Sequence, residues 1–530
     1  MATRIGVDVG GTNTDAVVVV DSRVVASHKT PTTADVTQGV VDAIGAVLAP
    51  SRRQADEVEA VMIGTTHFTN AVLERKRLLP VGVLRLALPS TAAIPPFTDW
   101  PDDLSALVRG GSWLVRGGYQ YTGALADALD EKGLTHALRD MKAAGIRSVA
   151  VTGLFAPVND SMETRAAEII RNELPDAQVT LSSTIGRLGL LERENAAILN
   201  ASLVDLSRRV VDSFRTALAA LGIEAPLFIS QNDGTLMSDA FVARYPVLTF
   251  ASGPTNSMRG AGFLSGLDDA LVVDIGGTTT DIGVLARGFP RESFIESDIG
   301  GVRTNFRMPD LLVRPLGGGS RVSEHGGEVR VGPESVGYRL TTEALVFGGS
   351  TITATDIAVA AGRADIGDRT LTRNLPKDTV RGGIERIHGI VEEGVDRMKT
   401  SAEPLPLVLV GGGAALIDGD IPGASEIVVP EHAGVANAVG ATIAKISGET
   451  DRVFSYEKTD RVDAIEAAKE EATRRAVAAG AVAESVEVLE VEELPVAYVP
   501  GGSVRVRVKV AGDLVGTHSK QSDTRAGNAA

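Results

Sequence analysis

One octapeptide occurs twice in this chain, and the two copies lie about half the chain length apart. DVGGTNTD occupies residues 8–15 and DIGGTTTD occupies residues 274–281, so six of the eight positions are identical. Each copy lies between two apolar, β-branched segments, a pattern that predicts two strands joined by a tight glycine turn. So large a separation is incompatible with the short period of a solenoid and predicts a duplicated domain.

The residue types in the repeat indicate phosphate binding. Glycine lets several backbone N–H groups approach one point, and such a concavity binds phosphate oxygens. An aspartate at the strand end repels phosphate, but it suits Mg²⁺, which prefers oxygen ligands and keeps much of its water. Asp8 and Asp274 are therefore predicted to hold Mg²⁺ and to orient the incoming nucleophile. Asp15 and Asp281 follow the turns and are expected to brace them by hydrogen bonds.

Two further segments are rich in small residues. An apolar run at 407–410 leads into Gly411, Gly412 and Gly413, which permits the close approach of a flat ring or a ribose. The segment 434–441 reads as a helix with small residues on one face, which allows close packing or hinge motion. Taken singly, a strand-to-helix turn and ordinary packing explain these segments equally well. The order of the four elements resembles that of the actin-like ATPase superfamily, and no Walker A pattern competes with it.

This resemblance covers about residues 1–446 and implies an α/β fold. Two actin-like ATPase (ribonuclease H-like) halves are expected to flank a nucleotide cleft. The expected divisions are 1–190 for the first half, 191–450 for the second, 451–515 for a small α+β appendage and 516–530 for a disordered tail. The residues expected to bind the nucleotide are Gly10, Gly11, Thr12, Asn13, Thr14, Gly276, Gly277, Thr278, Thr279, Gly411, Gly412, Gly413 and Ala414.

Charge and composition exclude several classes of protein. The net charge is −16 without a Lys/Arg cluster, so no binding to nucleic acid or to anionic membranes is expected. The sequence has no cysteine, which excludes disulfides, thiolate metal sites and a cysteine nucleophile. No apolar run is long enough for a bilayer span, and the N-terminus lacks a signal-peptide layout. A cytoplasmic protein is therefore expected.

A narrower resemblance spans almost the whole chain. The stretches 5–15, 64–71, 251–254, 274–281, 317–320 and 332–335 resemble, in order, the hydantoinase A/5-oxoprolinase family. The resemblance implies that ATP is used to open a cyclic amide or imide such as a hydantoin, oxoproline or a lactam, while other relatives carboxylate ketones. Longer members carry a further C-terminal part or have a separate B subunit, which implies a protein partner here. His67 departs from the family, which often has an aliphatic residue at that position.

The implied reaction proceeds through a phosphorylated carbonyl intermediate. An amide carbonyl is a poor electrophile, and phosphoryl transfer to its oxygen creates a good leaving group. Positioning, Mg²⁺ and backbone donors would supply most of the catalysis. The expected catalytic residues are Asp8, Asp274, Thr12, Thr278 and His67, with ATP and Mg²⁺ as cofactors. His67 could contact substrate or act as an acid or base, and a structural or partner-facing histidine is an open alternative.

Two other functions fit the same fold. A small-molecule kinase would leave phosphate on its substrate, and an ATP-driven reactivating chaperone would remodel a partner enzyme. Dehydratase activators of this superfamily are excluded because they need cysteines for their cluster. The expected partners are a small cyclic amide and a protein subunit, and a homo-oligomer stays open.

Overall fold

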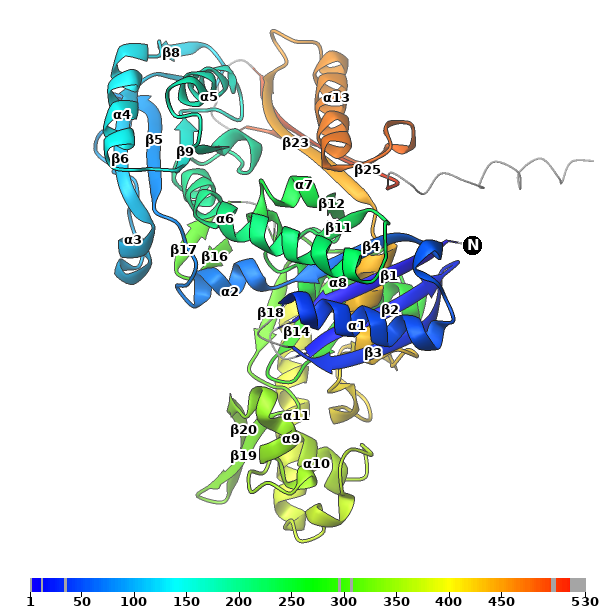
Figure 1. Cartoon of the computed structure of the whole chain (residues 1–530). Helices are drawn as coiled ribbons and strands as arrows, with labels where there is room; N and C mark the ends of the chain where they lie inside the picture. Colours follow the sequence, from blue (N-terminus) through cyan, green and yellow to red (C-terminus); the bar gives the residue numbers. More distant parts are fainter. Residues whose placement is uncertain are drawn as a thin grey trace, which may run out of the picture.

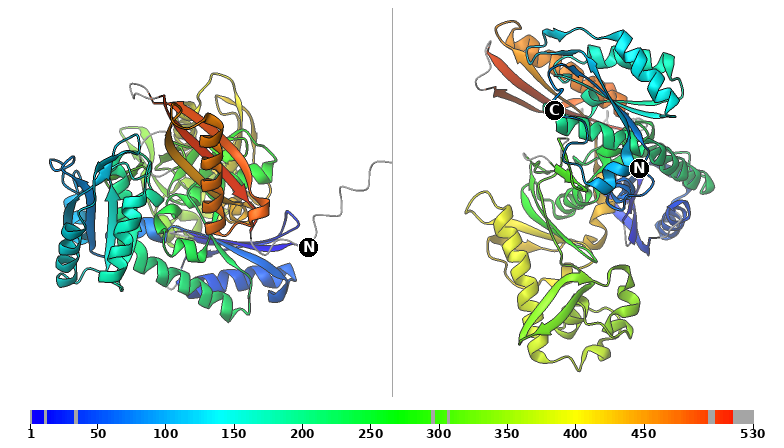
Figure 2. Two further views of the ribbon diagram at one scale, coloured as in Figure 1. Left: turned by 90° about the horizontal axis from the view of Figure 1, so that it is seen from above. Right: turned by 90° about the vertical axis from the view of Figure 1, so that its left-hand side faces the viewer.

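The computed structural model describes residues 2–10, 13–32, 36–293, 297–305, 308–496 and 502–514. Gly11 and Thr12 of the first turn, and the predicted tail 516–530, lie outside the described residues. The chain forms two halves around two large sheets, with a smaller lobe at each end of the molecule (Figures 1 and 2).

The sheet of the first half has five core strands. They are β1 (Thr3–Val9), β2 (Asn13–Val20), β3 (Arg23–Pro31), β4 (Val58–Thr65) and β11 (Leu227–Ser230). The first three form an antiparallel meander, and β4 and β11 then run parallel to β1 in the order β3-β2-β1-β4-β11. Most side chains of β1, β2, β4 and β11 are buried, which explains why these strands read as continuous apolar runs.

The sheet of the second half repeats this arrangement. Its core strands are β13 (Ala270–Ile275), β14 (Thr280–Ala286), β18 (Leu311–Arg314), β21 (Leu405–Val410) and β22 (Ala424–Val428). The strands β13, β14 and β18 are antiparallel, and β21 and β22 run parallel to β13. The equivalent pairing of the strands confirms the duplicated α/β fold that the repeat predicts.

Two helices cross between the sheets. These are α8 (Ser252–Ser265), which follows the first sheet, and α12 (Ala436–Ile443), which follows the second. A Cβ added at Gly440 would lie 1.9 Å from the carbonyl oxygen of Asn256, and one added at Gly260 would lie 1.9 Å from that of Ala436. The predicted close packing of the small-residue helix is therefore confirmed, and its partner is α8.

The lobe of the first half is a four-stranded parallel sheet with its own core. Its elements are β5 (Val81–Leu88), β6 (Arg109–Arg116), β9 (Ser148–Gly153), β10 (Gln178–Leu181), α4 (Glu131–Ala143) and α5 (Ser161–Glu173). The lobe of the second half contains β19 (Ser320–His325), β20 (Glu328–Ser335), α10 (Ala354–Ala360) and α11 (Lys377–Met398). Figure 1 shows the two lobes at opposite ends of the molecule.

The C-terminal segment extends the first sheet. It consists of β23 (Ile446–Ser455), α13 (Arg461–Ala479), β24 (Glu487–Pro495) and β25 (Ser503–Gly512). β23 pairs in parallel with β12 (Leu236–Ser238), so the nine-stranded sheet continues β11-β12-β23-β25-β24. The segment has the expected α+β content, but its strands are continuous with the first half.

The division between the sheets falls later than the expected boundary at residue 190. The helix α6 (Leu190–Ala220) packs against α1 (Val36–Ser51) and against β9, and β11 pairs with β4. These contacts assign the chain up to β12 to the first half. No helix in the described ranges is long and apolar enough to cross a membrane. The remaining short elements are α2 (His67–Leu73), α3 (Asp102–Val108), α7 (Asp239–Val242), α9 (Leu340–Glu343), β7 (Gly118–Tyr119), β8 (Leu125–Asp127), β15 (Phe289–Pro290), β16 (Ser297–Ile299) and β17 (Val302–Thr304).

Candidate functional site

The two copies of the octapeptide close with the same backbone hydrogen bond. The Gly10 N–H donates to the Asn13 carbonyl oxygen at 3.0 Å, and the Gly276 N–H donates to that of Thr279 at 2.9 Å. Asp8 pairs with Asp15 across the first hairpin, as Asp274 pairs with Asp281 across the second. Both turns therefore present an aspartate at the same place relative to the glycines.

The two turns share one electrostatic site. Asp274 in the second half raises the pKa of Asp8, and Lys29 and Asp15 in the first half act on the pKa of Asp274. Charges interact in this way only when they lie close together with little water between them. Asp274 therefore lies within electrostatic range of Asp8.

The Asp8 carboxylate is held by a residue that sequence reasoning missed. Asn437 on α12 donates from Nδ2 to Asp8 Oδ2 and to Asp15 Oδ2, both at 2.9 Å. Lys29 Nζ lies 2.6 Å from Asp15 Oδ1. Burial and the charges of Asp15 and Asp274 raise the pKa of Asp8 to about 7, while Asn437 and Lys29 oppose this rise. The Asp15 side chain thus contacts Asn437 on α12 and Lys29 on β3, and the expected bracing of its own turn stays a prediction.

The Asp274 carboxylate has different partners. Burial raises its pKa, and a hydrogen bond from Ser257 on α8 opposes that rise. Burial, and then the charge of Asp274, raise the pKa of Asp281 to about 7. The second copy therefore concentrates negative charge, which a divalent cation would relieve.

A glycine keeps the space beside each carboxylate free. Gly64 pairs with Asp8 on the neighbouring strand β4, and a Cβ there would lie 2.4 Å from Asp8 Oδ1. A Cβ at Gly411, after β21, would lie 2.2 Å from Asp274 Oδ1. Asp8 Oδ1 is buried and has no hydrogen-bond partner within the described part of the chain. A buried oxygen in this state suits a bound cation or its water.

The donor set fits Mg²⁺ through two carboxylates. No cluster of three or more His, Asp and Glu side chains suited to a metal occurs in the described ranges. Mg²⁺ is usually bound by one or two carboxylates together with waters and substrate phosphates. Asp8 and Asp274 therefore meet its ordinary requirement, although they would not hold the ion without those other ligands.

The glycine loop at 317–320 supports the second turn. The Gly318 N–H donates to the Gly276 carbonyl oxygen at 3.0 Å, and the Gly319 N–H donates to that of Gly277 at 2.8 Å. A Cβ at Gly317 would lie 2.5 Å from the backbone nitrogen of Thr278. The two loops are thus packed backbone to backbone, which only glycine permits.

The expected adenosine loop lies beside the same turn. The Gly413 N–H donates to the carbonyl oxygen of Ile275, the last residue of β13, at 2.8 Å. Gly411 has a φ of +83°, which disfavours any side chain. A Cβ at Gly412 or Gly277 would meet no atom within 4 Å, so both glycines border open space. Ala414 is buried behind them.

Other predicted residues of the turns differ in exposure. Thr14 is buried, and its hydroxyl lies 3.2 Å from that of Thr32, which donates to the Gly10 carbonyl oxygen at 2.8 Å. Thr14 therefore supports the first turn through Thr32. Asn13 and Thr278 are partly buried, and Thr279 is exposed.

His67 lies next to the first turn. It opens α2 and follows Thr66, whose N–H donates to the Val9 carbonyl oxygen at 3.4 Å. Its Nδ1 lies 2.6 Å from the hydroxyl oxygen of Thr65. Burial and the charge of Arg77 lower its pKa, so the ring is neutral at pH 7. A neutral imidazole here can accept or donate one proton beside the first turn.

Comparison with known proteins gives two matching family models. The model described as "Hydantoinase/oxoprolinase N-terminal region" matches residues 4–174, and the model "Hydantoinase/oxoprolinase" matches residues 193–403. Together they cover most of both halves up to residue 403, including both turns.

Individual relatives include subunits of larger enzymes. The acetophenone carboxylase gamma subunit of Aromatoleum aromaticum is 26% identical over 458 residues, covering 78% of this chain and 58% of that protein. The caprolactamase subunit alpha of Pseudomonas jessenii is 26% identical over 418 residues, covering 74% of this chain and 59% of that protein. The chain thus matches less than two thirds of the length of these relatives. The crystal structure of ATP-dependent caprolactamase from Pseudomonas jessenii superposes with a TM-score of 0.75 at 19% identity, covering 96% of this chain and 87% of that one.

Proposed function

Because the chain belongs to the hydantoinase/oxoprolinase family, as its sequence resemblance predicts, we propose that it is an ATP-dependent hydrolase or hydrolase subunit that opens a cyclic amide. The observation that carries this proposal is the pair of equivalent glycine turns, in which Asp274 raises the pKa of Asp8 and Asp15 raises that of Asp274. A caprolactamase subunit among the relatives supports a lactam-type ring.

The proposed nucleotide position follows from the open glycines. The phosphates lie between the two turns, where Gly277 borders open space, and the adenosine lies along Gly412. Asp8 and Asp274 would hold Mg²⁺ with its waters, and the bound ion would supply positive charge beside the transferring phosphoryl group. Ser257 and Asn437 fix the two carboxylates by the hydrogen bonds described above.

The proposed reaction begins with the amide oxygen. That oxygen attacks the γ-phosphorus of ATP, the bond to the leaving ADP oxygen breaks, and the carbonyl carbon becomes a strong electrophile. One water then adds to this carbon, and the C–N bond breaks to open the ring as an acyl phosphate. A second water releases phosphate and leaves the amino acid. Backbone N–H groups of the turns would stabilise the phosphoryl charge.

A second candidate is the ATP-dependent carboxylation of a ketone. The acetophenone carboxylase gamma subunit matches this chain at the same identity as the caprolactamase subunit and over a longer stretch. Ketone activation would use the same first half-reaction, phosphoryl transfer to a carbonyl oxygen, and would differ in the group that attacks next.

The test is ADP release from the chain purified together with its natural partner subunit. A panel of lactams, hydantoin and oxoproline is compared with ketones plus bicarbonate. We expect one ring to raise ADP release at least about tenfold, with an equimolar ring-opened acid. A ketone-dependent response would select carboxylation, and phosphate retained on a product would select a kinase. The proposal would be contradicted if ADP release stayed at its background level over the whole panel. If one enzyme were then recovered as the dominant partner, a reactivating chaperone would be favoured instead.

A further inference from the structure

A polar cavity of about 140 Å³ lies beyond the carboxyl end of β11. Its walls are the segment 183–187 from the lobe of the first half, residues 231–233 after β11, and residues 447–449 of β23, with α13 on the remaining side. The volume corresponds to about five water molecules. The cavity is therefore the size of a small ring and not of a nucleotide.

This cavity shares a sheet edge with the first glycine turn. The strands β1, β4 and β11 are parallel, so their carboxyl ends lie at one edge. The glycine turn follows β1, His67 follows β4, and Gln231 follows β11. Ligands of open α/β sheets bind outside the carboxyl ends of the strands.

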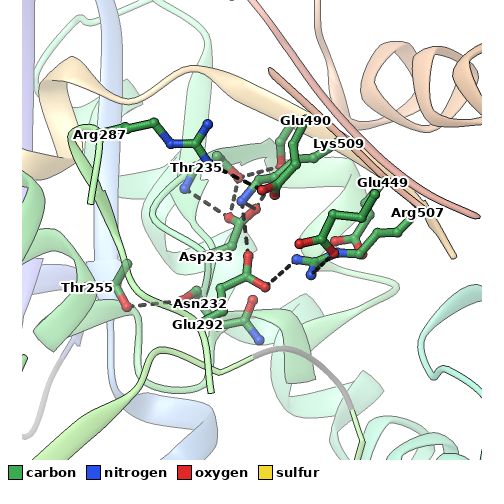
Figure 3. Close-up of polar contacts among 12 residues, drawn as sticks. Asn232, Asp233, Thr235, Thr255, Arg287, Glu292, Glu449, Glu490, Arg507 and Lys509 are labelled. Carbon is green, nitrogen blue, oxygen red and sulfur yellow. Dashed lines mark hydrogen bonds and ion pairs between the residues drawn. The ribbon is translucent and has the colours of Figure 1, made fainter. Parts of the chain in front are cut away.

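Helix α8 connects the cavity wall to the aspartate site. Thr255 donates from its hydroxyl to the Asn232 carbonyl oxygen at 3.0 Å, a contact that Figure 3 shows. The next residue, Asn256, donates to the Ser230 hydroxyl oxygen at 3.0 Å, and Ser257 then reaches Asp274. Three consecutive residues of one helical turn thus contact both the cavity wall and a proposed metal ligand.

Two polar side chains of the cavity wall have unused hydrogen-bonding capacity. Gln231 is 8% exposed, and its Nε2 donates to the Leu236 carbonyl oxygen at 3.0 Å, while its Oε1 accepts no hydrogen bond within the described residues. Ser183 is buried, and its hydroxyl has no partner in the same part of the chain. Its backbone is fixed because the Ser183 N–H donates to Glu163 Oε2 at 3.0 Å. The pair offers one fixed acceptor and one rotatable hydroxyl donor.

The charged groups around the cavity are already paired. Arg187 lies 3.7 Å from the Asp451 carboxylate. Asp233 lies 3.1 Å from Lys509 Nζ, a pair that Figure 3 shows. Burial raises the pKa of Asp233, but Lys509 and the hydrogen bonds of Thr235 outweigh it and hold the pKa at about 2. A charged ligand would have to break these pairs, whereas a neutral polar ligand would not.

We propose that this cavity binds the ring of a small neutral cyclic amide. The ring N–H donates to Gln231 Oε1, and the ring carbonyl accepts from the Ser183 hydroxyl. The methylene groups lie against Ile185, Phe241 and Leu248, which supply the apolar part of the wall. This inference rests on the proposed function, because it names the place where the amide of that reaction is held.

The test is the binding of 2-pyrrolidinone and hydantoin to the full chain without nucleotide, followed by ligand-observed NMR. Gln231→Met and Ser183→Ala each remove one hydrogen bond and are expected to weaken binding roughly 3- to 10-fold. Ala479→Leu fills the cavity with a larger side chain and is expected to abolish ligand binding. Ser105→Ala, in a buried position of α3, is the matched control and is expected to bind like the wild type.

The possible outcomes separate this inference from the proposed function. If the three cavity variants weaken amide binding but no ring raises ADP release, the result would support the site and count against the hydrolase. Ring-dependent ADP release with unchanged kinetics in all three variants would keep the hydrolase and overturn the site. Absence of binding in the wild type, or equal binding in the wild type and Ala479→Leu, would also overturn it. Thermal unfolding of each variant checks that the chain is folded.

Discussion

The two copies of the glycine turn share their strand pairing and differ in their neighbours. Both close with one N–H to carbonyl hydrogen bond, and both place a glycine beside the strand-end carboxylate. Asp8 is held by Asn437, and a lysine balances its hairpin partner, whereas Asp274 is held by Ser257 and has the uncompensated Asp281 across the hairpin. The two copies thus share the closing hydrogen bond and the adjacent glycine, and they differ in the side chains around them.

The partners also cross between the halves. Asn437 is on α12, which follows the second sheet, and it contacts Asp8 in the first. Ser257 is on α8, which follows the first sheet, and it contacts Asp274 in the second. Each carboxylate is therefore positioned by the other half's connecting helix. Any change in how α8 crosses α12 would move both carboxylates together.

The largest expected effect tests whether the copies are equivalent in catalysis. Asp8→Asn and Asp274→Asn keep the side-chain shape and remove the charge that would hold Mg²⁺. Each is expected to lower ATP hydrolysis roughly 100- to 1,000-fold, because either loss leaves the phosphoryl charge poorly compensated. ADP release measured at saturating ATP checks this. An equal loss in both variants would support equivalence, whereas normal hydrolysis in either one would break it.

The next effect tests the crossing of the two helices. Gly440→Ala places a Cβ 1.9 Å from a backbone oxygen, which cannot move without separating α8 and α12. We expect a loss of roughly 3 kcal/mol in the free energy of unfolding, measured by urea titration. Gly389→Ala in α11 is the matched control, since its Cβ would meet nothing within 4 Å. That substitution is expected to stabilise the chain by about 0.5–1 kcal/mol, and equal effects at the two sites would contradict the close crossing.

A smaller effect on ATP turnover is expected from substituting the glycines beside the two carboxylates. Gly64→Ala and Gly411→Ala push Asp8 and Asp274, respectively, out of position, and each is expected to lower ATP turnover about 10- to 100-fold. Gly411 also has a φ of +83°, so its substitution costs about 1 kcal/mol of additional stability. Turnover and thermal unfolding measured on both variants sharpen the comparison. Unchanged turnover in either would show that the space beside that carboxylate is not used.

The smallest effect concerns pH and Asp281, which has no ion pair among the described residues. Its pKa is raised from 3.8 to about 7 in the folded chain, so the unfolded state releases the proton first as pH rises. The native state therefore loses stability between about pH 4 and pH 7, and the loss is complete above pH 7. Asp281→Asn cannot ionise, and it should raise the unfolding temperature at pH 8 but not at pH 4 when metal and nucleotide are absent.

A control with the opposite sign is available in the same half. Hydrogen bonds from Thr370 lower the pKa of the exposed Asp368. The stability that Asp368 contributes is present at pH 8 and is lost as the pH falls. Asp368→Asn should therefore lower the unfolding temperature more at pH 8 than at pH 4. The same trend in both variants would contradict the assigned causes.

The sequence predicts the features of the site that the local backbone determines. The two turns, the loop of Gly411 and the small face of α12 follow from glycine and aspartate at defined spacings, and all of these segments lie together. Asn437 could not be predicted, since its contact with Asp8, 429 residues away, has no local signal. Ser257 could not be predicted either, because its hydrogen bond to Asp274 depends on how α8 packs on the second sheet. Repeated segments that differ only at Val9/Ile275 and Asn13/Thr279 also hide how their surroundings diverge.

The C-terminal strands show the same limit at the level of the fold. Their alternating pattern predicts strands and one helix, but not that β23 joins the first sheet through β12. Such pairing depends on contacts between segments far apart in the chain. The small residues Ala464, Ala468, Ala472 and Ala476 lie at a spacing of four and are all buried in α13. In retrospect this spacing is the one local sign that the helix packs closely on a sheet.

The central claim is that both turns bind one Mg·ATP together. Isothermal titration of the wild-type chain is predicted to give one site per chain. Two variants are predicted to weaken Mg·ATP binding at least about 100-fold: Gly277→Val in the second half and Asp8→Asn in the first. A Cβ at Gly277 meets no neighbouring atom within 4 Å, so the valine does not disturb the fold. Two independent sites, or wild-type affinity in either folded variant, would contradict the account.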